Sequence, residues 1–298
     1  MTILLALLLD RLFGEPPARW HPVVWMGAYL GWAGRGLPAL PPRLALLAGA
    51  ACWLGGALLV VLLAGAAARV LTAAPAWIGV PALALLLKPL FALRLLLDEV
   101  AATEAALGQG LDAGRARLAR IVSRDTGALS AGEVRESALE SLAENLSDSL
   151  VAPLFWFLLL GLPGAALYRF ANTADAMWGY RGRWEWAGKW AARADDVLSF
   201  VPARLTGLAL MGAGALRLDG LARLVREARR PASPNAGWPM AAMALALGVR
   251  MGKPGVYLLN AAGAVPGPSD LRRGLRRAAL AGTGLALLAA ACEVVGHG

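Results

Sequence analysis

An uncharged window from Leu44 to Ala68 constrains the fold more than any other feature of the sequence. The hydrocarbon core of a bilayer is ~30 Å thick and takes ~20 apolar residues of helix, so a window of this length spans a membrane. Composition agrees, because 58% of the residues are hydrophobic and 16% are charged, against ~45–50% and ~25% in soluble proteins. We therefore predict an integral membrane protein, and we exclude a disordered, fibrous or disulfide-stapled chain.

Three further stretches are expected to span: Val70–Leu87, which is short or continues through Lys88 and Arg94 to Leu97, then Ser149–Tyr168, and Ala278–Val295 with one charge, Glu293. Three more are ambiguous. Val197–Leu216 contains Pro202 and Arg204, Pro231–Val249 begins with the turn-forming residues PASPNAGWP, and Met1–Leu9 is too short. We expect an all-α polytopic protein with about five spans, in a range of four to seven, and with re-entrant or interfacial segments. One membrane-embedded domain covers residues 1–298.

A polar segment from Asp98 to Asp148 interrupts the apolar chain. It holds ten of the twenty acidic residues, and its apolar positions recur at helical spacing, which predicts a helical excursion outside the bilayer. Arginines gather in Arg217–Arg230 and again in Arg250–Arg277, as expected of cytoplasmic flanks. This distribution explains the net charge of +9 better than a nucleic-acid partner does. The N-terminus carries no cleavage site, so we do not expect a cleaved signal peptide.

The most informative run is ESLAENLSDSLVAPLFW, from Glu140 to Trp156. Glu140, Glu144 and Asp148 recur every four residues and share one face of a helix. Like charges at that spacing repel, so helix propensity does not explain them, whereas a divalent cation or a cationic ligand would. The alternative is a solvated acidic face. It is weakened because this face runs directly into an apolar span, where an unpaired carboxylate is costly.

Two further clusters carry polar chemistry. In the first, Asn172, Thr173 and Asp175 offer the oxygen ligands that Mg²⁺ prefers, and Arg181 offers a fork for phosphate or carboxylate. In the second, Asp195 and Asp196 precede Arg204, although adjacent aspartates also serve as helix caps. We expect Arg181 and Arg204 to contact anionic groups of the substrate.

The N-terminal block joins Asp10 and Gly14-Glu-Pro16 to His21-Pro-Val23. A lone histidine is more often structural, and only His297 could join it at a zinc site. Ser123-Arg-Asp-Thr126 is a shorter, weaker signal. No P-loop, Rossmann or nucleophile-elbow motif occurs.

Together these blocks resemble the adenosylcobinamide-phosphate synthase family, the integral membrane CobD/CbiB proteins of cobalamin biosynthesis. The resemblance covers nearly the whole chain. Ala174 and Ser199 stand where we associate Leu and Asn with the family. Ser199 in place of Asn removes one hydrogen-bonding group. The blocks are DRLFGEP with HPV (Asp10–Val23), IVSRDT (Ile121–Thr126), Glu140–Trp156, NTADAMWGYR (Asn172–Arg181), DDVLSFVPARL (Asp195–Leu205) and SPNAGWPMAAMA (Ser233–Ala244).

The resemblance implies a carbon–nitrogen ligase that joins a propionate carboxylate of adenosylcobyric acid to aminopropanol or its phosphate. ATP and Mg²⁺ would activate the carboxylate, and other late cobalamin enzymes are implied as partners beside the corrinoid and membrane lipid. The implied site faces the cytoplasm from the cell membrane. The implied catalytic residues are Glu140, Glu144, Asp148 and Asp175, the last three as magnesium ligands. The implied substrate-binding residues are His21, Arg124, Asp125, Asn145, Asn172, Thr173, Arg181, Asp195, Asp196, Arg204 and Asn235.

Two other function classes stay open at this stage. Charges inside apolar stretches, at Lys88, Arg204 and Glu293, together with proline-broken spans are typical of a secondary transporter. No inverted repeat supports that alternative. The second of these classes is a membrane scaffold for pathway enzymes. A scaffold would keep its function when the carboxylates are replaced.

Overall fold

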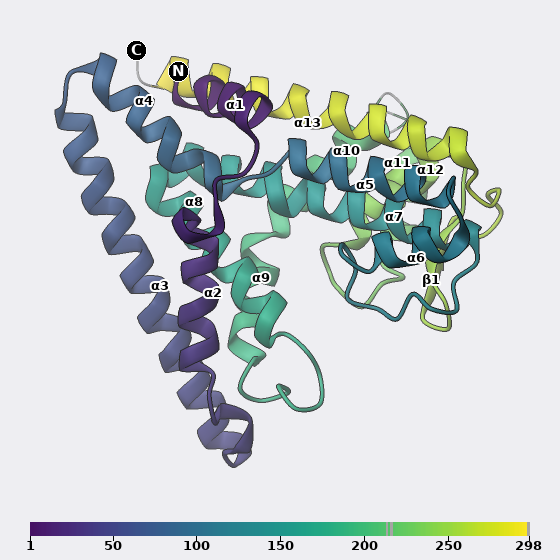
Figure 1. The fold of residues 1–298 in the computed structure, drawn as a ribbon, viewed down its shortest axis with the longest axis horizontal. Helices are drawn as coiled ribbons and strands as arrows, with labels where there is room; N and C mark the ends of the chain where they lie inside the picture. Colours follow the sequence, from purple (N-terminus) through teal and green to yellow (C-terminus); the bar gives the residue numbers. More distant parts are fainter. Residues whose placement is uncertain (213, 215–216, 297–298) are drawn as a thin grey trace. The chain divides into compact units, whose positions relative to one another are not determined.

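The computed structural model describes residues 1–212, 214 and 217–296, which form two compact units (Figure 1). Unit 1 comprises Met1–Ala92, Ala152–Ser199 and the C-terminal residues from Ala286, and unit 2 comprises Leu93–Val151 and Phe200–Leu285. Each unit buries its own apolar core, around Tyr168 and Phe170 in unit 1 and around Leu139 and Leu142 in unit 2. The polar excursion expected at 98–148 thus folds together with residues 200–285.

Unit 1 is helical throughout the part that the structure describes. Its helices are α1 (Thr2–Phe13), α2 (Pro22–Ala33), α3 (Pro42–Ala73), α4 (Ala76–Leu87), α8 (Ala152–Trp178), α9 (Lys189–Leu198) and the end of α13 (Pro268–Gly296), with short 3₁₀ turns η1 (Ala18–Trp20), η2 (Leu37–Ala39) and η3 (Lys88–Leu90). The long helix α3 packs against α8, α4 and α9.

Unit 2 contains α5 (Arg94–Leu107), α6 (Leu111–Leu118), α7 (Ala131–Leu146), the π-turn η4 (Ser147–Val151), α10 (Phe200–Met211), α11 (Leu218–Ala228), α12 (Gly237–Leu247) and most of α13. It also contains a hairpin, β1 (Met251–Lys253) with β2 (Tyr257–Leu259), which pairs antiparallel. Its turn follows from Pro254-Gly255, since Gly255 adopts a φ of +71°. The described residues are otherwise helices and loops apart from one isolated bridge between Val249 and Ala264, which confirms the expected all-α class.

Among the described residues, four helical segments are long and apolar enough to cross a membrane: Pro42–Ala73, Ala76–Leu107, Ala131–Trp178 and Pro268–Val295. This number lies within the expected range, and the chain is a helical membrane protein. Helix α3 contains the whole of Leu44–Ala68. The stretch Val70–Leu87 is not continuous, because α3 ends at Ala73 and α4 begins after Pro75.

The apolar stretch Ser149–Tyr168 also departs from a straight span. It begins in the π-turn η4 and breaks inside α8 at Gly161, which has a φ of +66° and is followed by Pro163. A left-handed glycine and a proline two residues later stop the regular hydrogen-bond ladder, so the backbone kinks there.

The two ambiguous stretches near residues 200 and 240 are both interrupted. Val197–Leu216 divides between α9, which ends at Leu198, and α10. Its residues 213, 215 and 216 lie outside the described chain, as does His297. Pro231–Val249 turns as far as Ala236, but the Gly-Trp-Pro of its expected turn forms the start of α12. Pro239 is tolerated there because the first turn of a helix needs no amide donor from it.

Glu293, the single charge of the last apolar stretch, binds the beginning of α1. The backbone amides of Thr2 and Ile3 donate to its two carboxylate oxygens at 2.8 and 2.9 Å. Helix α1 has no capping side chain of its own. Glu293 therefore accepts hydrogen bonds from amides that the start of a helix leaves without partners. Its negative charge also lies at the positive end of the helix dipole, which is favourable.

We predict that Glu293→Gln lowers the stability of the protein by about 1–2 kcal/mol, because an amide nitrogen replaces one acceptor and the negative charge is lost. Thermal unfolding in detergent measures the effect, and the exposed Glu185→Gln in unit 1 is the matched control. Equal unfolding temperatures for the two variants would contradict this capping role.

Candidate functional site

In unit 2, the IVSRDT block and the ESLAEN block meet through Arg124 and Glu140. One guanidinium nitrogen of Arg124 donates to Glu140 Oε2 at 2.9 Å and the other donates to Ser137 Oγ at 3.2 Å. Glu140 is 1% exposed, so an ion pair is the condition for keeping it charged there. The structure therefore joins two residues that the sequence assigned to the site separately.

The same face of α7 continues the polar contacts. Ser141 donates its hydroxyl to the carbonyl of Ile121 at 3.0 Å, which fixes the loop that carries Arg124. Asn145 donates to the Ser141 carbonyl at 3.0 Å. Asp125 is exposed, and its carboxylate accepts the amide of Gly127 at 2.9 Å, which closes a turn. Asn145 and Asp125 thus shape the loop and the helix around the ion pair.

Glu144 and Asp148, the other members of the predicted acidic face, are both half-buried. Between them α7 passes into the π-turn η4 at Ser147, whose buried hydroxyl has no hydrogen-bond partner among the described residues. Single π-turns inside helices occur frequently at functional sites. The wider turn carries Asp148 on a backbone that differs from a regular α-helix.

The β1–β2 hairpin adds residues that sequence reasoning missed. It packs against α7 (Figure 1), and Arg250 just before it donates to Glu136 Oε1 at 3.1 Å. A cavity of about 400 Å³ lies between them, with Lys253 and Tyr257 in its wall. Burial and the charge of Glu140 raise the pKa of the Tyr257 phenol, which keeps it protonated as a donor. The dipeptide Pro254-Gly255 was the available signal for this turn.

In unit 1, the NTADAMWGYR block meets the start of DDVLSF. Asn172 donates its amide to Asp195 Oδ1 at 3.4 Å. Burial, followed by the charges of Asp175 and Asp196, raises the pKa of Asp195 to about 7. Burial also raises the pKa of Asp196. Three carboxylates of this unit thus repel one another in one place, and a cation or an ammonium group would relieve that repulsion.

A close glycine contact holds Asp175 in position. Its carbonyl accepts the amide of Gly179 at 2.7 Å, and a Cβ added at Gly179 would lie 2.0 Å from Asp175 Oδ1. Only glycine leaves room for the carboxylate at this helix end. The other residues of the block differ in role: Thr173 donates to the Arg169 carbonyl in its own helix at 2.7 Å, and Arg181 is exposed beyond the helix.

Ser199, one of the departures from the family pattern, keeps a hydrogen bond. It is buried in unit 1, and its hydroxyl lies 3.1 Å from the Tyr168 hydroxyl. The backbone amide of Ser199 also donates to the Asp195 carbonyl at 2.8 Å. The serine therefore still supports the Asp195 end of α9.

Arg204 of α10 binds the SPNAGWP block of unit 2. It donates to Asn235 Oδ1, and to the carbonyls of Phe200 and Pro234 at 2.9 Å each. Its guanidinium also lies over the rings of Phe200 and Trp238. These contacts make Arg204 a positioning residue for Asn235, and its predicted contact with substrate remains a prediction.

The N-terminal block forms a buried charge network in unit 1. Lys88 Nζ pairs with Asp10 Oδ1 at 3.1 Å and with Glu15 Oε1 at 2.7 Å. His21 caps α2, because its Nδ1 accepts the Val23 amide, and this fixes the tautomer that presents Nε2–H to Glu15 at 3.0 Å. Burial opposes ionisation, but the His21 and Lys88 contacts hold the pKa of Glu15 below its ordinary value.

No three His, Cys, Asp or Glu side chains gather to hold one metal ion in residues 1–212, 214 and 217–296. The predicted magnesium ligands divide between the units, with Asp175 in unit 1 and with Glu144 and Asp148 in unit 2. The assignment of these three residues as magnesium ligands remains a prediction.

We predict that Asp195→Asn raises the unfolding temperature above the wild-type value at pH 8 by about 2 °C or more. A carboxyl whose folded pKa is about 7 contributes stability below its ordinary pKa and loses it as the pH rises through 7. The difference from wild type should therefore shrink at pH 5. An exposed aspartate variant, Asp112→Asn, should show no such pH dependence, and a constant difference for Asp195→Asn would refute the titration.

We also predict that Arg124→Gln destabilises the protein by about 3–5 kcal/mol, because it leaves Glu140 buried without its cation. The double variant Arg124→Gln, Glu140→Gln should recover more than half of that loss. A double-mutant cycle of thermal stabilities measures the coupling. Additive losses in the double variant would show that the ion pair is not coupled.

Comparison with known proteins identifies the family of the chain. The family model described as CobD/Cbib protein matches residues 3–278. The probable cobalamin biosynthesis protein CobD of Thermococcus kodakarensis is 42% identical over 93% of this chain and 90% of its own length. The cobalamin biosynthesis protein CobD of Rhodobacter capsulatus is 41% identical over 96% of this chain and 95% of its own. No solved structure matches significantly. The chain therefore belongs to the CobD/CbiB family of cobalamin biosynthesis proteins.

Proposed function

We propose that this protein joins a propionate carboxylate of adenosylcobyric acid to the amine of aminopropanol or of aminopropanol phosphate, with ATP as the driving reagent. The observation that carries the proposal is the carboxylate cluster of unit 1. Asp195 has a pKa of about 7 and lies with Asp175 and Asp196. Such a group binds an ammonium ion and accepts its proton at neutral pH.

The reaction balances in two steps. A carboxylate oxygen of the corrinoid first attacks the γ-phosphorus of ATP, which forms an acyl phosphate and releases ADP. The neutral amine then attacks the acyl carbon, inorganic phosphate leaves, and the amide nitrogen gives up one proton. The ammonium form cannot attack because its nitrogen has no lone pair, so a base must first remove a proton.

Each cluster suits one reactant by its own chemistry. We assign the amine to the Asp175, Asp195 and Asn172 cluster of unit 1. The cations Arg124, Arg250 and Lys253 around α7 of unit 2 suit the phosphates of ATP, with Tyr257 as a further donor. Magnesium, which would screen the phosphate charge, would take oxygen ligands from ATP and from Glu144, Asp148 or Asp175.

The charges that favoured a transporter each have a structural partner within one unit. Lys88 pairs with Asp10 and Glu15, and Glu293 caps α1. Arg204 binds the loop at Pro234 and Asn235. These contacts explain charges in apolar helices without a transported ion, and they favour the ligase over the transporter.

We place the reaction on the cytoplasmic side of the cell membrane. ATP is cytoplasmic, and the arginine-rich segment from Arg217 to Arg230 favours the same side under the positive-inside rule.

The experiment is to incubate the purified protein in detergent with adenosylcobyric acid, ATP, Mg²⁺ and either amine, and to detect the amide by mass spectrometry. We predict that Glu144→Gln and Asp148→Asn each reduce turnover about 100-fold or more, as expected when a group that stabilises phosphate charge or metal is removed. The exposed Asp112→Asn, also in unit 2, is the control.

Thermal stability and membrane insertion of the two site variants should match those of the wild type. Full activity in both variants at saturating Mg²⁺ would remove the acidic face from the mechanism. Absence of any amide from the wild-type protein with either amine would overturn the ligase, and the scaffold or the transporter would then take its place.

A further inference from the structure

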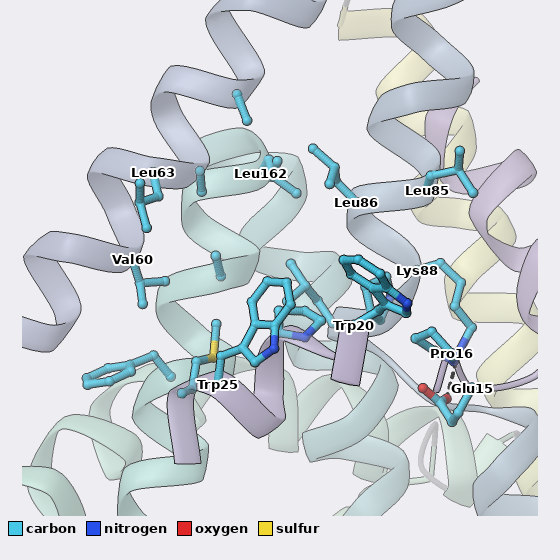
Figure 2. Close-up of a pocket in the computed structure, with 18 of the residues that line it drawn as sticks. Glu15, Pro16, Trp20, Trp25, Val60, Leu63, Leu85, Leu86, Lys88 and Leu162 are labelled. Atoms are coloured by element: carbon cyan, nitrogen blue, oxygen red, sulfur yellow. Dashed lines mark hydrogen bonds and ion pairs between the residues drawn. The ribbon is translucent and has the colours of Figure 1, made fainter. Parts of the chain in front are cut away.

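Unit 1 carries an open apolar pocket of about 690 Å³ (Figure 2), which we call the cavity. Its wall is built by η1, α2, α3, the α4–η3 junction and α8. This volume lies within the ~300–1,000 Å³ of cavities that bury a small organic ligand. The wall is almost entirely hydrocarbon, so the cavity selects an apolar occupant.

The charged residues of the wall, Glu15 and Lys88, belong to an ion-paired network. Figure 2 shows Lys88 and Glu15 joined at the edge of the cavity, at 2.7 Å, and Lys88 also pairs with Asp10. Two carboxylates thus surround one lysine, so the network offers no free cation that would attract a phosphate or a carboxylate into the cavity. A corrinoid with its amide side chains would lose hydrogen bonds to water in this cavity and find few in return.

The cavity shares α3 with the surface that faces lipid. Leu63 lines the cavity and is itself 63% exposed, and Leu58 and Leu62 on the same helix are each 60% exposed, so the cavity opens on the outer surface of α3. Because α3 is a membrane-spanning helix, the medium around it is acyl chain. Water does not fill an apolar cavity of this kind stably. The lipid acyl chains next to the cavity therefore supply its occupant.

Two exposed indole rings line the cavity. Trp20 and Trp25 line it and are 64% and 54% exposed. Trp25 Nε1 donates to the Arg19 carbonyl at 3.0 Å, and the Arg19 guanidinium lies 5.9 Å from the Trp20 ring centre. Tryptophan beside arginine is typical of the headgroup level of a bilayer.

We propose that this cavity binds one acyl chain of a membrane phospholipid, with the headgroup outside near Arg19. The chain would lie against Pro16, Trp20 and Pro22, which belong to the same block that supplies Glu15 and His21 to the charge network. The bound lipid is then a structural ligand that holds the N-terminal block in place.

Photolabelling tests the site without any need for activity. The protein is reconstituted in nanodiscs of phosphatidylcholine that contain a fraction with a diazirine on one acyl chain, irradiated, digested and mapped by mass spectrometry. In the wild type, label should concentrate on the cavity residues of α2 and α3 relative to the lipid-facing Leu58 and Leu62.

Ala64 and Ala67 line the cavity, whereas Ala66 lies between them in sequence and is exposed. Ala64→Phe with Ala67→Phe should reduce cavity labelling about tenfold, because the rings take the space of the chain. Ala66→Phe should leave it unchanged. If the double variant does not fold, the distribution of label over the wild-type protein tests the proposal by itself.

Equal labelling of the cavity residues and of Leu58 and Leu62 would show ordinary annular lipid and overturn the proposal. Displacement of the label by adenosylcobyric acid would do so as well, since it would make the cavity a substrate site. Loss of label on formation of a dimer would assign the cavity to a second copy of the chain and would equally exclude the lipid.

Discussion

A charge buried beside apolar helices requires a partner, and this requirement organises both units. Lys88 is held by Asp10 and Glu15, Glu140 by Arg124, and the start of α1 by Glu293. In each case the partner comes from another segment of the chain. Removal of one member leaves a charge or an amide without a partner at low dielectric, which costs more than the pair itself contributes. The contacts therefore fix how segments pack together within a unit.

The carboxylates of Asp175 and Asp195 differ from these pairs, because their neighbours include other carboxylates. They lie together with Asp196, on which Arg193 acts, and burial followed by the charge of Asp175 raises the pKa of Asp195 to about 7. Such an arrangement reduces stability at neutral pH, and a protein retains it where the charge has a use. The ammonium group of an amine substrate would supply the missing positive charge and would meet a base of suitable strength.

The N-terminal block of unit 1 has a polar side and an apolar side. Its polar side supplies Asp10, Glu15 and His21 to the charge network, and its apolar side forms a wall of the 690 Å³ cavity. Both faces need their own partner, lysine on one side and hydrocarbon on the other. This explains why glutamate, prolines and tryptophan follow one another so closely in a short segment.

The sequence by itself determined the helical membrane class, most of the apolar segments and the residues that carry charge, because hydropathy and helical spacing are local properties. The kink at Gly161, the break at Pro75 and the Met251–Leu259 hairpin depended on packing and turn geometry that apolar windows do not record. Only the tertiary structure decided the partners: Arg124 neutralises part of the predicted acidic face, Lys88 joins the N-terminal block, and Tyr257 reaches Glu140. Ion pairs between distant segments depend on three-dimensional distance and burial, neither of which a residue's position along the chain specifies.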